Sequence, residues 1–295
     1  MIGSSASMRP GRVRKGAGFG LVLLLLAASS SCARRVANPS ESAIVLADKG
    51  RNAEAAQLLE AELQRHPEAL RERRLLIRVY GALGNLGAAQ RHSEQLGRQL
   101  GPASPIPFLE LGHAHELCHR YDAALVLYDQ AMRVAPNDPA GPRTGGLRAA
   151  EWGEVEEAEP RLSEAVRRAP RDARAWHALG VVRVKLGDLP GAEQAYRAGA
   201  SADPRGLDNH IGLATLGLLR DDPRAVLAEY DAVVLLSPAF ADAHLGRAWA
   251  LVRLGRFDDA TQAIDDAARL GASSRTVEKQ RRWLASERTK SASTR

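Results

Sequence analysis

Three histidines and a cysteine lie close together in the first half of the chain: His113, His115, Cys118 and His119. Imidazole and thiolate groups are the ligands that zinc prefers in proteins. His115 and His119 are four residues apart, which places them on one face if this stretch is helical. A single helix supplies no fourth ligand at a fixed position, so the sequence predicts that these residues pack against their neighbours and hold no metal.

No other group of residues suggests catalysis. The sequence contains no serine-hydrolase elbow, phosphate-binding loop, metalloprotease helix or Cys-x-x-Cys pair. Adjacent carboxylates, such as Asp221 with Asp222, stand where helix caps are expected. We therefore predict that the protein is not an enzyme and uses no cofactor, metal or small-molecule substrate. The alternative is a metal-binding accessory of an enzyme, built on the histidine cluster.

Residues 1–31 have the composition of an export signal. A basic head is followed by an apolar run, Gly18 to Ala28, which is shorter than the roughly 20 residues that span a bilayer. Ser29, Ser30 and Ser31 then precede Cys32. The small residues before this cysteine are typical of secreted lipoproteins.

This stretch resembles the lipobox of bacterial lipoproteins, from which Ser29 departs because an aliphatic residue is common there. The resemblance implies cleavage before Cys32, lipidation of Cys32, and an outer-membrane lipoprotein that faces the periplasm. Such an anchor is durable, since each buried methylene contributes about 0.8 kcal/mol. The alternative is ordinary cleavage after Ala33, which leaves a soluble periplasmic protein.

The net charge of the chain does not indicate a nucleic-acid partner. The full sequence has 41 basic and 35 acidic residues, or +6. The export signal contains four of the basic residues: Arg9, Arg12, Arg14 and Lys15. The remaining 37 basic residues against 35 acids give +2. A nearly neutral exported chain lacks the positive footprint of a DNA- or RNA-binding protein.

The spacing of prolines and turn residues reveals an internal repeat. Four prolines recur every 34 residues: Pro136, Pro170, Pro204 and Pro238. A second series keeps the same step: Gly153, Gly187, Asp221 and Gly255. Proline cannot continue a helix, and glycine tolerates the positive φ at which helices end. Only 4% of the residues are aromatic, and good helix formers dominate, so the period predicts pairs of helices.

The unit resembles the tetratricopeptide repeat (TPR), a helical hairpin with a period of about 34 residues. Unit 173–206 shows the family pattern at Trp176, Leu179, Gly180, Gly187, Ala192, Tyr196 and Pro204. Unit 105–138 shows it at Phe108, Leu111, Gly112, Ala124, Tyr128, Ala131 and Pro136. The resemblance implies an all-α, right-handed superhelical TPR solenoid. Tyrosines at matching places are expected to fill the space between helices: Tyr128, Tyr196 and Tyr230.

The register predicts the domain organisation. Residues 32–40 link the lipidation site to the first repeat, and the solenoid covers 36–274. It contains about seven repeats: 36–69, 70–104, 105–138, 139–172, 173–206, 207–240 and 241–274. Residues 275–286 are predicted to form a capping helix, and 287–295 a disordered tail.

The fourth repeat departs from the pattern. Gly145 and Gly146 fall within its first helix, and Pro160 within its second. Each glycine costs about 1 kcal/mol relative to alanine, and an interior proline up to about 3 kcal/mol. Two interpretations stay open, a tolerated local weakness or a flexible joint between repeats 1–3 and 5–7.

The concave face of a TPR superhelix is lined by the first helix of each hairpin. The resemblance places five basic residues on that face: Arg71, Arg74, Arg78, Arg143 and Arg174. Apolar residues follow in the later repeats: Val181, Val184, Ile211, Leu218, Leu245, Trp249 and Val252. We predict a groove that holds a protein segment, with anionic groups near Arg74 and Arg78 and apolar groups near Trp249. The alternative is that the charges only solvate the face and the apolar residues pack on their neighbours.

The sequence as a whole predicts a scaffold or adaptor of the bacterial cell envelope that binds proteins or peptides in its groove. In outline, an export signal, an anchor and about seven repeats, it is similar to the pilotin-like TPR lipoproteins of type IV and Tad pilus systems. That similarity implies assistance in the assembly of an envelope complex such as a pilus or secretin system. A soluble periplasmic chaperone and an adaptor for peptidoglycan enzymes are the alternatives. The fold does not choose among them.

Overall fold

Helices follow one another through residues 38–293, which is the part of the chain that this computed structural model describes. The first helices of the seven hairpins are α1 (Pro39–Asp48), α3 (Leu70–Ala82), α5 (Ile106–Leu117), α7 (Ala140–Trp152), α9 (Ala173–Lys185), α11 (Leu207–Leu219) and α13 (Ala241–Arg253). The second helices are α2 (Asn52–Arg65), α4 (Leu86–Leu100), α6 (Tyr121–Val134), α8 (Val155–Arg168), α10 (Leu189–Ala202), α12 (Pro223–Leu236) and α14 (Phe257–Arg269). Helix α15 (Ser274–Ser293) ends the array, and the fold is an all-α TPR superhelix.

Each hairpin turns on a residue with a left-handed backbone. Gly187 has φ 83° between α9 and α10, where a side chain would be strained. Two residues other than glycine take the same conformation, Asp221 at φ 52° and His119 at φ 57°. Asp and His are among the residue types that tolerate it best. His119, from the suspected metal cluster, is therefore the turn residue of its hairpin.

The second helices of two hairpins, α10 and α12, begin at a capping aspartate. The side chain of Asp188 accepts a hydrogen bond from the backbone N–H of Gly191 at 2.9 Å, and α10 starts at the next residue. Asp222 accepts from the N–H of Ala225 at 3.1 Å in the same way before α12. The cap at Asp222 was expected from the sequence and is confirmed. Such a cap stabilises a helix by about 1 kcal/mol.

Three tyrosines, Tyr128, Tyr196 and Tyr230, each lie against a glycine in the packing of the helices. Tyr196 is 3% exposed and lies against Gly180 of α9 and Gly212 of α11. A Cβ on either glycine would stand under 3.0 Å from the ring. One tyrosine thus fills the space between its own hairpin and the next, as the sequence predicted. Tyr128, which is fully buried, does the same against Gly112.

Glycines in the fourth repeat serve close packing of its helices. A Cβ on Gly141 would lie 2.5 Å from the backbone nitrogen of Met132 in α6. A Cβ on Gly146 would lie 2.9 Å from the backbone nitrogen of Leu162 in α8. Only glycine permits these approaches. Gly145 and Gly146, which sequence reasoning treated as a weakness or a joint, are buried contact points of α7, Gly145 with Tyr128 of α6 and Gly146 with Leu162 of α8.

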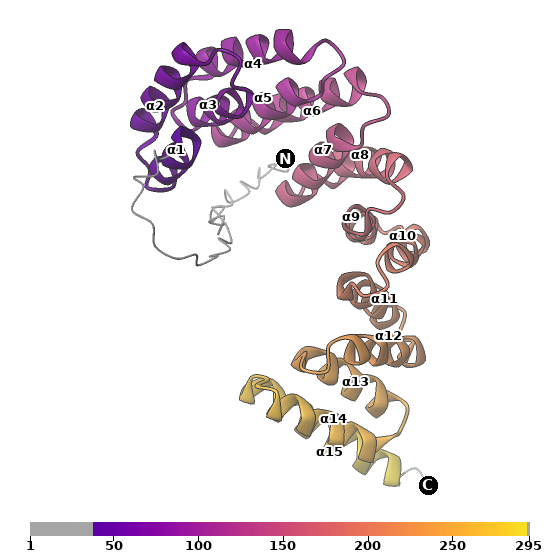
Figure 1. Ribbon diagram of the computed structural model, residues 1–295. Coiled ribbons are helices and arrows are strands. Elements are labelled where there is room, and N and C mark those ends of the chain that lie inside the picture. The colour runs from indigo at the N-terminus through magenta and orange to yellow at the C-terminus, as the bar shows by residue number, and fades with distance from the viewer. Residues whose placement is uncertain (1–37, 294–295) are drawn as a thin grey trace, which may run out of the picture. The chain divides into compact units, whose positions relative to one another are not determined.

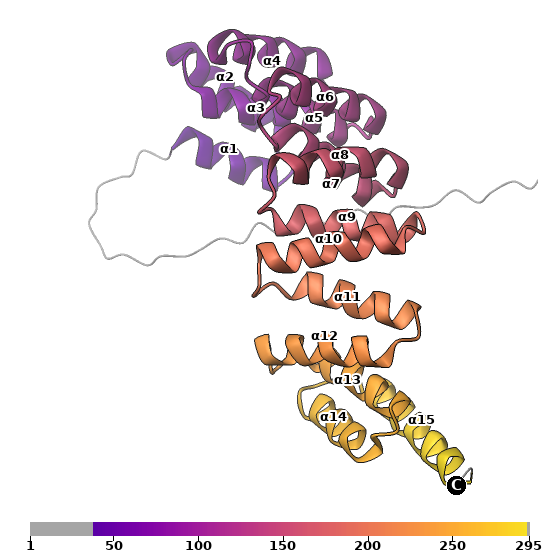
Figure 2. The ribbon, with the colours of Figure 1, turned by 90° about the vertical axis from the view of Figure 1, so that its right-hand side faces the viewer.

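Successive hairpins stack in chain order, as the helix labels of Figure 1 show. First helices also touch each other from one repeat to the next, α1 with α3, α3 with α5, α7 with α9 and α9 with α11. Among the residues described, no two successive second helices pack to a comparable extent. Figure 2 shows α9 to α12 as adjacent layers. The first helices therefore form the inner face, where the predicted groove residues stand.

The end of the solenoid differs from the prediction. Helix α15 runs on to Ser293, whereas the sequence predicted a helix to 286 and disorder beyond it. An ion pair of Arg288 with Asp258 at 2.7 Å connects its last turns to α14, and Lys290 pairs with Glu287 of the same helix at 2.8 Å. Within 38–293 no helix combines the length and the apolar character needed to cross a membrane.

Candidate functional site

Three arginines of α3 stand on one side of the helix, while its other side is buried. Leu76 and Ile77 are fully buried in the packing with α4 and neighbouring helices. Arg71, Arg74 and Arg78 follow a helical spacing of three and four residues and are exposed. They line one recess together with Ile44 of α1, Leu75, and Glu110 of α5. The structure thus brings together the three predicted basic residues of the second repeat.

Glu110 forms the floor of this recess and is 1% exposed. One of its oxygens accepts a hydrogen bond from Nε of Arg74 at 2.8 Å and another from Nη2 of Arg78 at 3.1 Å. Both arginine side chains remain nearly half exposed, at 45% and 46%. A buried carboxylate therefore fixes two surface arginines in place from below.

The surroundings of Glu110 keep it ionised. Burial by itself would raise the pKa of its carboxyl group. The His113 ring, 3.9 Å away, and the guanidinium groups of Arg78 and Arg74 outweigh burial and lower the pKa to about 2. The carboxylate is thus charged at neutral pH and cancels one of the three positive charges of the recess.

Arg71 is the third positive charge of the recess and has no ion-pair partner among the described residues. Three guanidinium groups against one carboxylate leave the recess with a charge of +2. A carboxylate or another anionic group that enters would meet Arg71 directly and the outer faces of Arg74 and Arg78. The walls also offer apolar surface from Ile44 and Leu75.

The basic character weakens further along the inner face. Arg143 pairs with Asp172 at 2.7 Å, so its charge is already compensated. Asp172 in turn caps α9 by accepting from the N–H of Ala175. Arg174 is exposed and makes no ion pair within 38–293. The predicted basic stretch thus has its uncompensated charge at Arg71 and at Arg174.

The apolar residues of repeats five and six are shared between core and surface. Val181 and Val184 pack on the cluster that contains Tyr196 and Leu216, and they are half-buried. Ile211 is half-buried as well. Leu218 is exposed at 38%. This part of the groove offers a partner little free apolar surface, which agrees with the packing alternative.

The predicted groove is wrong at two residues of the seventh repeat. Leu245 is 8% exposed and Val252 is 4% exposed, so neither is accessible to a partner. Val252 belongs to the cluster that includes Val277 and Leu284 of α15. The capping helix covers the inner face of α13 at this point, as the first helix of a further repeat would.

Trp249 is half-buried, and its ring is partly covered by a cation. The guanidinium group of Arg253 lies 5.8 Å from the ring centroid. Arg253 also forms an ion pair with Asp221, one hairpin earlier. The tryptophan therefore has a place in the packing of repeats six and seven, and a partner would reach only part of its ring.

The histidine cluster does not converge on one point. His113 lies edge-on against Tyr128, while the Cys118 thiol donates to the carbonyl oxygen of Gly81 at 3.2 Å. His119 lies beside Tyr121 in the turn. In the described part of the chain no three His, Cys, Asp or Glu side chains are arranged to hold a metal ion. Cys32, the predicted lipidation site, lies outside the described residues.

Sequence reasoning missed Glu110 as the residue that organises the recess. Its signal is present in the sequence, since it is the single acid in the apolar stretch Ile106–Leu111. A charge in such a stretch is buried and needs partners. The partners stand 32 and 36 residues earlier, close to one period of the repeat.

Comparison with known proteins agrees with the helical-hairpin array. The tetratricopeptide repeat family model matches residues 144–206 and 220–275. The TPR repeat-containing thioredoxin TTL4 of Arabidopsis thaliana is 29% identical over 202 residues, which are 65% of this chain and 29% of that protein. The HSC co-chaperone sgt12 of Aspergillus fumigatus is 30% identical over 95 residues, or 32% of this chain and 28% of that protein. The chain spans less than a third of these curated relatives.

Solved structures share the fold at low sequence identity. The C-terminal part of a TPR repeat-containing protein from Cytophaga hutchinsonii superimposes with a TM-score of 0.62 at 13% identity, covering 82% of this chain and 98% of that one. YrrB, a TPR protein with an unusual peptide-binding site, gives a TM-score of 0.53 at 16% identity, covering 62% and 95%. The fold is that of a TPR solenoid, and nothing in these comparisons indicates enzymatic activity.

Proposed function

We propose that the protein is a non-catalytic scaffold that captures an acidic segment of a partner protein on the inner face of its solenoid. The observation that carries this proposal is the recess of α3, where Glu110 holds Arg74 and Arg78 while Arg71 stays uncompensated. Fixed guanidinium groups bind carboxylates well because little side-chain freedom remains to be lost on binding. The neighbouring Ile44 and Leu75 fit an apolar side chain next to the acidic group.

The comparisons support a binding role of this kind. YrrB, which shares the fold, has a peptide-binding site, and sgt12 is a co-chaperone, which is a class of adaptor protein. Similar hairpin arrays thus serve to hold protein segments. For this chain, the residues of the α3 recess favour a partner segment that has an anionic group next to an apolar side chain.

The proposal is tested by changing Arg71 and leaving its two neighbours intact. Reversal of Arg74 or Arg78 would place a carboxylate beside the buried Glu110 and disturb the fold, so it cannot separate binding from stability. Arg71→Glu removes the charge that has no partner and leaves the packing unchanged. Arg205→Glu is the matched control, because Arg205 is exposed in the loop before α11 and is far along the chain from the recess.

Each tagged variant is used to capture partners from its own cells, and the captured proteins are quantified by mass spectrometry. We expect Arg71→Glu to reduce the captured partner about tenfold relative to Arg205→Glu, since an interfacial charge contact is worth 1–2 kcal/mol when it is partly desolvated. The captured protein should bear an acidic segment whose deletion abolishes capture. Equal capture by the two variants would contradict the proposal.

We further propose that the scaffold acts in the cell envelope, held to the outer membrane through lipid on Cys32, and assists the assembly of a complex such as a pilus or secretin system. The basic head, the short apolar run and the small residues before Cys32 support this location. Membrane fractionation of Cys32→Ala is the test. We expect the variant to leave the membrane fraction, and continued membrane association would count against the lipid anchor.

A further inference from the structure

The C-terminal helix carries far more positive than negative charge. Helix α15 has six basic and two acidic residues between Ser274 and Ser293, a net charge of +4. Four of the basic residues form ion pairs: Arg281 with Asp265, Arg282 with Glu278, Arg288 with Asp258, and Lys290 with Glu287. Arg275 and Lys279 are left without a partner within the described residues.

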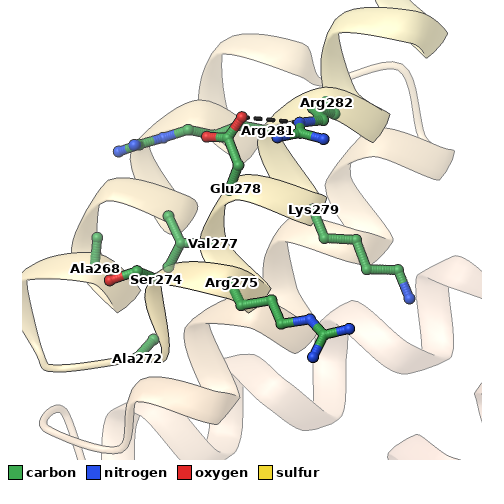
Figure 3. Close-up of a pocket in the computed structure, with 9 residues that line it drawn as sticks. All are labelled: Ala268, Ala272, Ser274, Arg275, Val277, Glu278, Lys279, Arg281 and Arg282. Atoms are coloured by element: carbon green, nitrogen blue, oxygen red, sulfur yellow. Dashed lines mark hydrogen bonds and ion pairs between the residues drawn. The ribbon is translucent and has the colours of Figure 1, made fainter.

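These two unpaired cations line the same recess, which Figure 3 shows at the junction of α14 and α15. In the figure Arg275 and Lys279 project to the same side of the helix, and Arg282 follows in the next turn. The Ala268 and Ala272 side chains also line the recess, on the other side of it from Arg275 and Lys279 in this view. The surface is thus a hollow with a small apolar part, whose one acid, Glu278, is paired with Arg282, so that its charge is net positive.

The position of Arg275 on its helix makes the missing partner more notable. It stands in the first turn of α15, which begins after Ser273 and contains no acidic residue in that turn. The N-terminal end of a helix carries a partial positive charge, and a basic side chain there is unfavourable by about 0.3–1 kcal/mol. An anion bound in the recess would relieve the repulsion and interact with the helix end as well as with both side chains.

We propose that this recess of α14 and α15 is a second protein-binding site, which takes an extended acidic segment of a partner. Arg275 and Lys279 are one turn apart, about 6 Å along the helix. In an extended peptide, side chains two residues apart lie on the same side about 6.6 Å from each other. Carboxylates at alternate positions of such a segment therefore match the two cations. A small residue of the same segment fits next to the two alanines.

An anionic membrane is the less fitting occupant. Basic clusters that bind lipid surfaces contain four to eight cations, each contributing about 1 kcal/mol near the surface. Only two cations are unpaired here, and they line a hollow rather than a flat face. This site is independent of the α3 recess, since it uses other residues at the other end of the chain.

The test measures binding of a fluorescein-labelled peptide of alternating glutamate and serine to the purified full-length protein by fluorescence anisotropy at low salt. All proteins carry Arg71→Gln, so the α3 recess contributes equally to each measurement. We expect Arg275→Gln with Lys279→Gln to weaken binding about tenfold, the sum of two exposed charge contacts. The matched control is Arg205→Gln with Arg224→Gln, which changes the net charge by the same amount at exposed positions outside the recess.

The control pair should bind the peptide as the parent protein does, and a peptide of alternating glutamine and serine should not bind. Equal weakening by both pairs would overturn the proposal, because it would show diffuse attraction only. The proposal would also be overturned, in favour of a membrane, if Arg275→Gln with Lys279→Gln bound the peptide unchanged but lost binding to phosphatidylglycerol vesicles. Both pairs replace exposed side chains, and an unchanged helical circular dichroism signal verifies that each variant is folded.

Discussion

Replacement of Glu110 by glutamine tests the electrostatic design of the inner face. The side chain keeps its size and can still accept one hydrogen bond, but the buried negative charge is lost. Arg74 and Arg78 then face each other with nothing between them to balance their charges. We expect a less stable solenoid that nevertheless presents more positive charge to a partner.

The size of the effect follows from the surroundings of Glu110. A pKa lowered from 4.5 to about 2 corresponds to a preference of about 3 kcal/mol for the charged carboxylate over the protonated form. Nearly half of each guanidinium group is open to water, which screens the pairs and solvates the arginines when the carboxylate is gone. We therefore expect Glu110→Gln to lower the free energy of unfolding by about 1–3 kcal/mol at neutral pH.

The effect must depend on pH in a defined direction. The folded-state pKa of Glu110 lies below its ordinary value, so its contribution is complete above pH 4.5 and is lost as the pH falls towards 2. Urea unfolding followed by far-UV circular dichroism, at neutral pH and at steps down to pH 3, measures the difference between the two proteins. The gap in unfolding midpoint should shrink over that window, since below pH 4.5 Glu110 of the unfolded chain takes up a proton while Glu110 of the folded protein stays ionised, which favours unfolding of the native protein.

The binding readout separates this account from a purely structural one. Because Glu110→Gln raises the charge of the recess from +2 to +3, and this added attraction outweighs the looser hold on Arg74 and Arg78, capture of an acidic partner should increase although stability falls. A variant that is as stable as the native protein at neutral pH would refute the reasoning, and so would a stability gap that persists unchanged to pH 3. Reduced capture in a folded variant would refute the link between Glu110 and the partner site.

Two further predictions concern packing. Gly180→Ala should lower the free energy of unfolding, measured by thermal unfolding, by about 1–3 kcal/mol, because its Cβ would collide with the buried ring of Tyr196. The control is Leu179→Met, a volume-conserving change at the neighbouring buried position, which should cost less than about 1.5 kcal/mol in the same assay. Removal of α15 should expose the apolar cluster around Val252 and cause self-association, which light scattering measures; a truncated chain that stays monomeric and equally stable would contradict the capping role.

The repeat architecture could be predicted because it depends on local signals that recur. Proline, glycine and capping aspartate each affect the backbone within a few residues of their own position. Because these signals recur every 34 residues, they indicate the same repeat several times over. The same reasoning reaches the tyrosine that fits between two glycines, since all three recur in register. His119 completes the series of left-handed turn residues, a role that the spacing of the repeat assigns to its position.

The binding surface could be predicted only in part, because accessibility and charge compensation are set by neighbours one repeat away. Arg74 and Arg78 lie on the inner face as expected, but the pairing with Glu110 decides how much charge they offer. Val252 occupies a groove position of its repeat and is buried because α15 covers it. In the last repeat, the positions that the TPR pattern places on the inner face are thus covered by the helix that follows.

The glycines of the fourth repeat show the limit of propensity arguments. A helix propensity scale counts Gly146 as a cost, since it considers each helix alone. The structure shows its Cα in contact range of the α8 backbone, where any side chain would force the helices apart. Tertiary packing thus overrides the local preference.

Site-specific photo-crosslinking in living cells tests the central claim most directly. A photoreactive phenylalanine analogue is placed at position 71, in the recess of α3, or at position 133, an exposed site on the second helix α6. The account predicts a strong adduct with an acidic partner from position 71 and none from position 133. Adducts from position 133 alone, or equal adducts from both, would show that the inner face is not the surface that holds the partner.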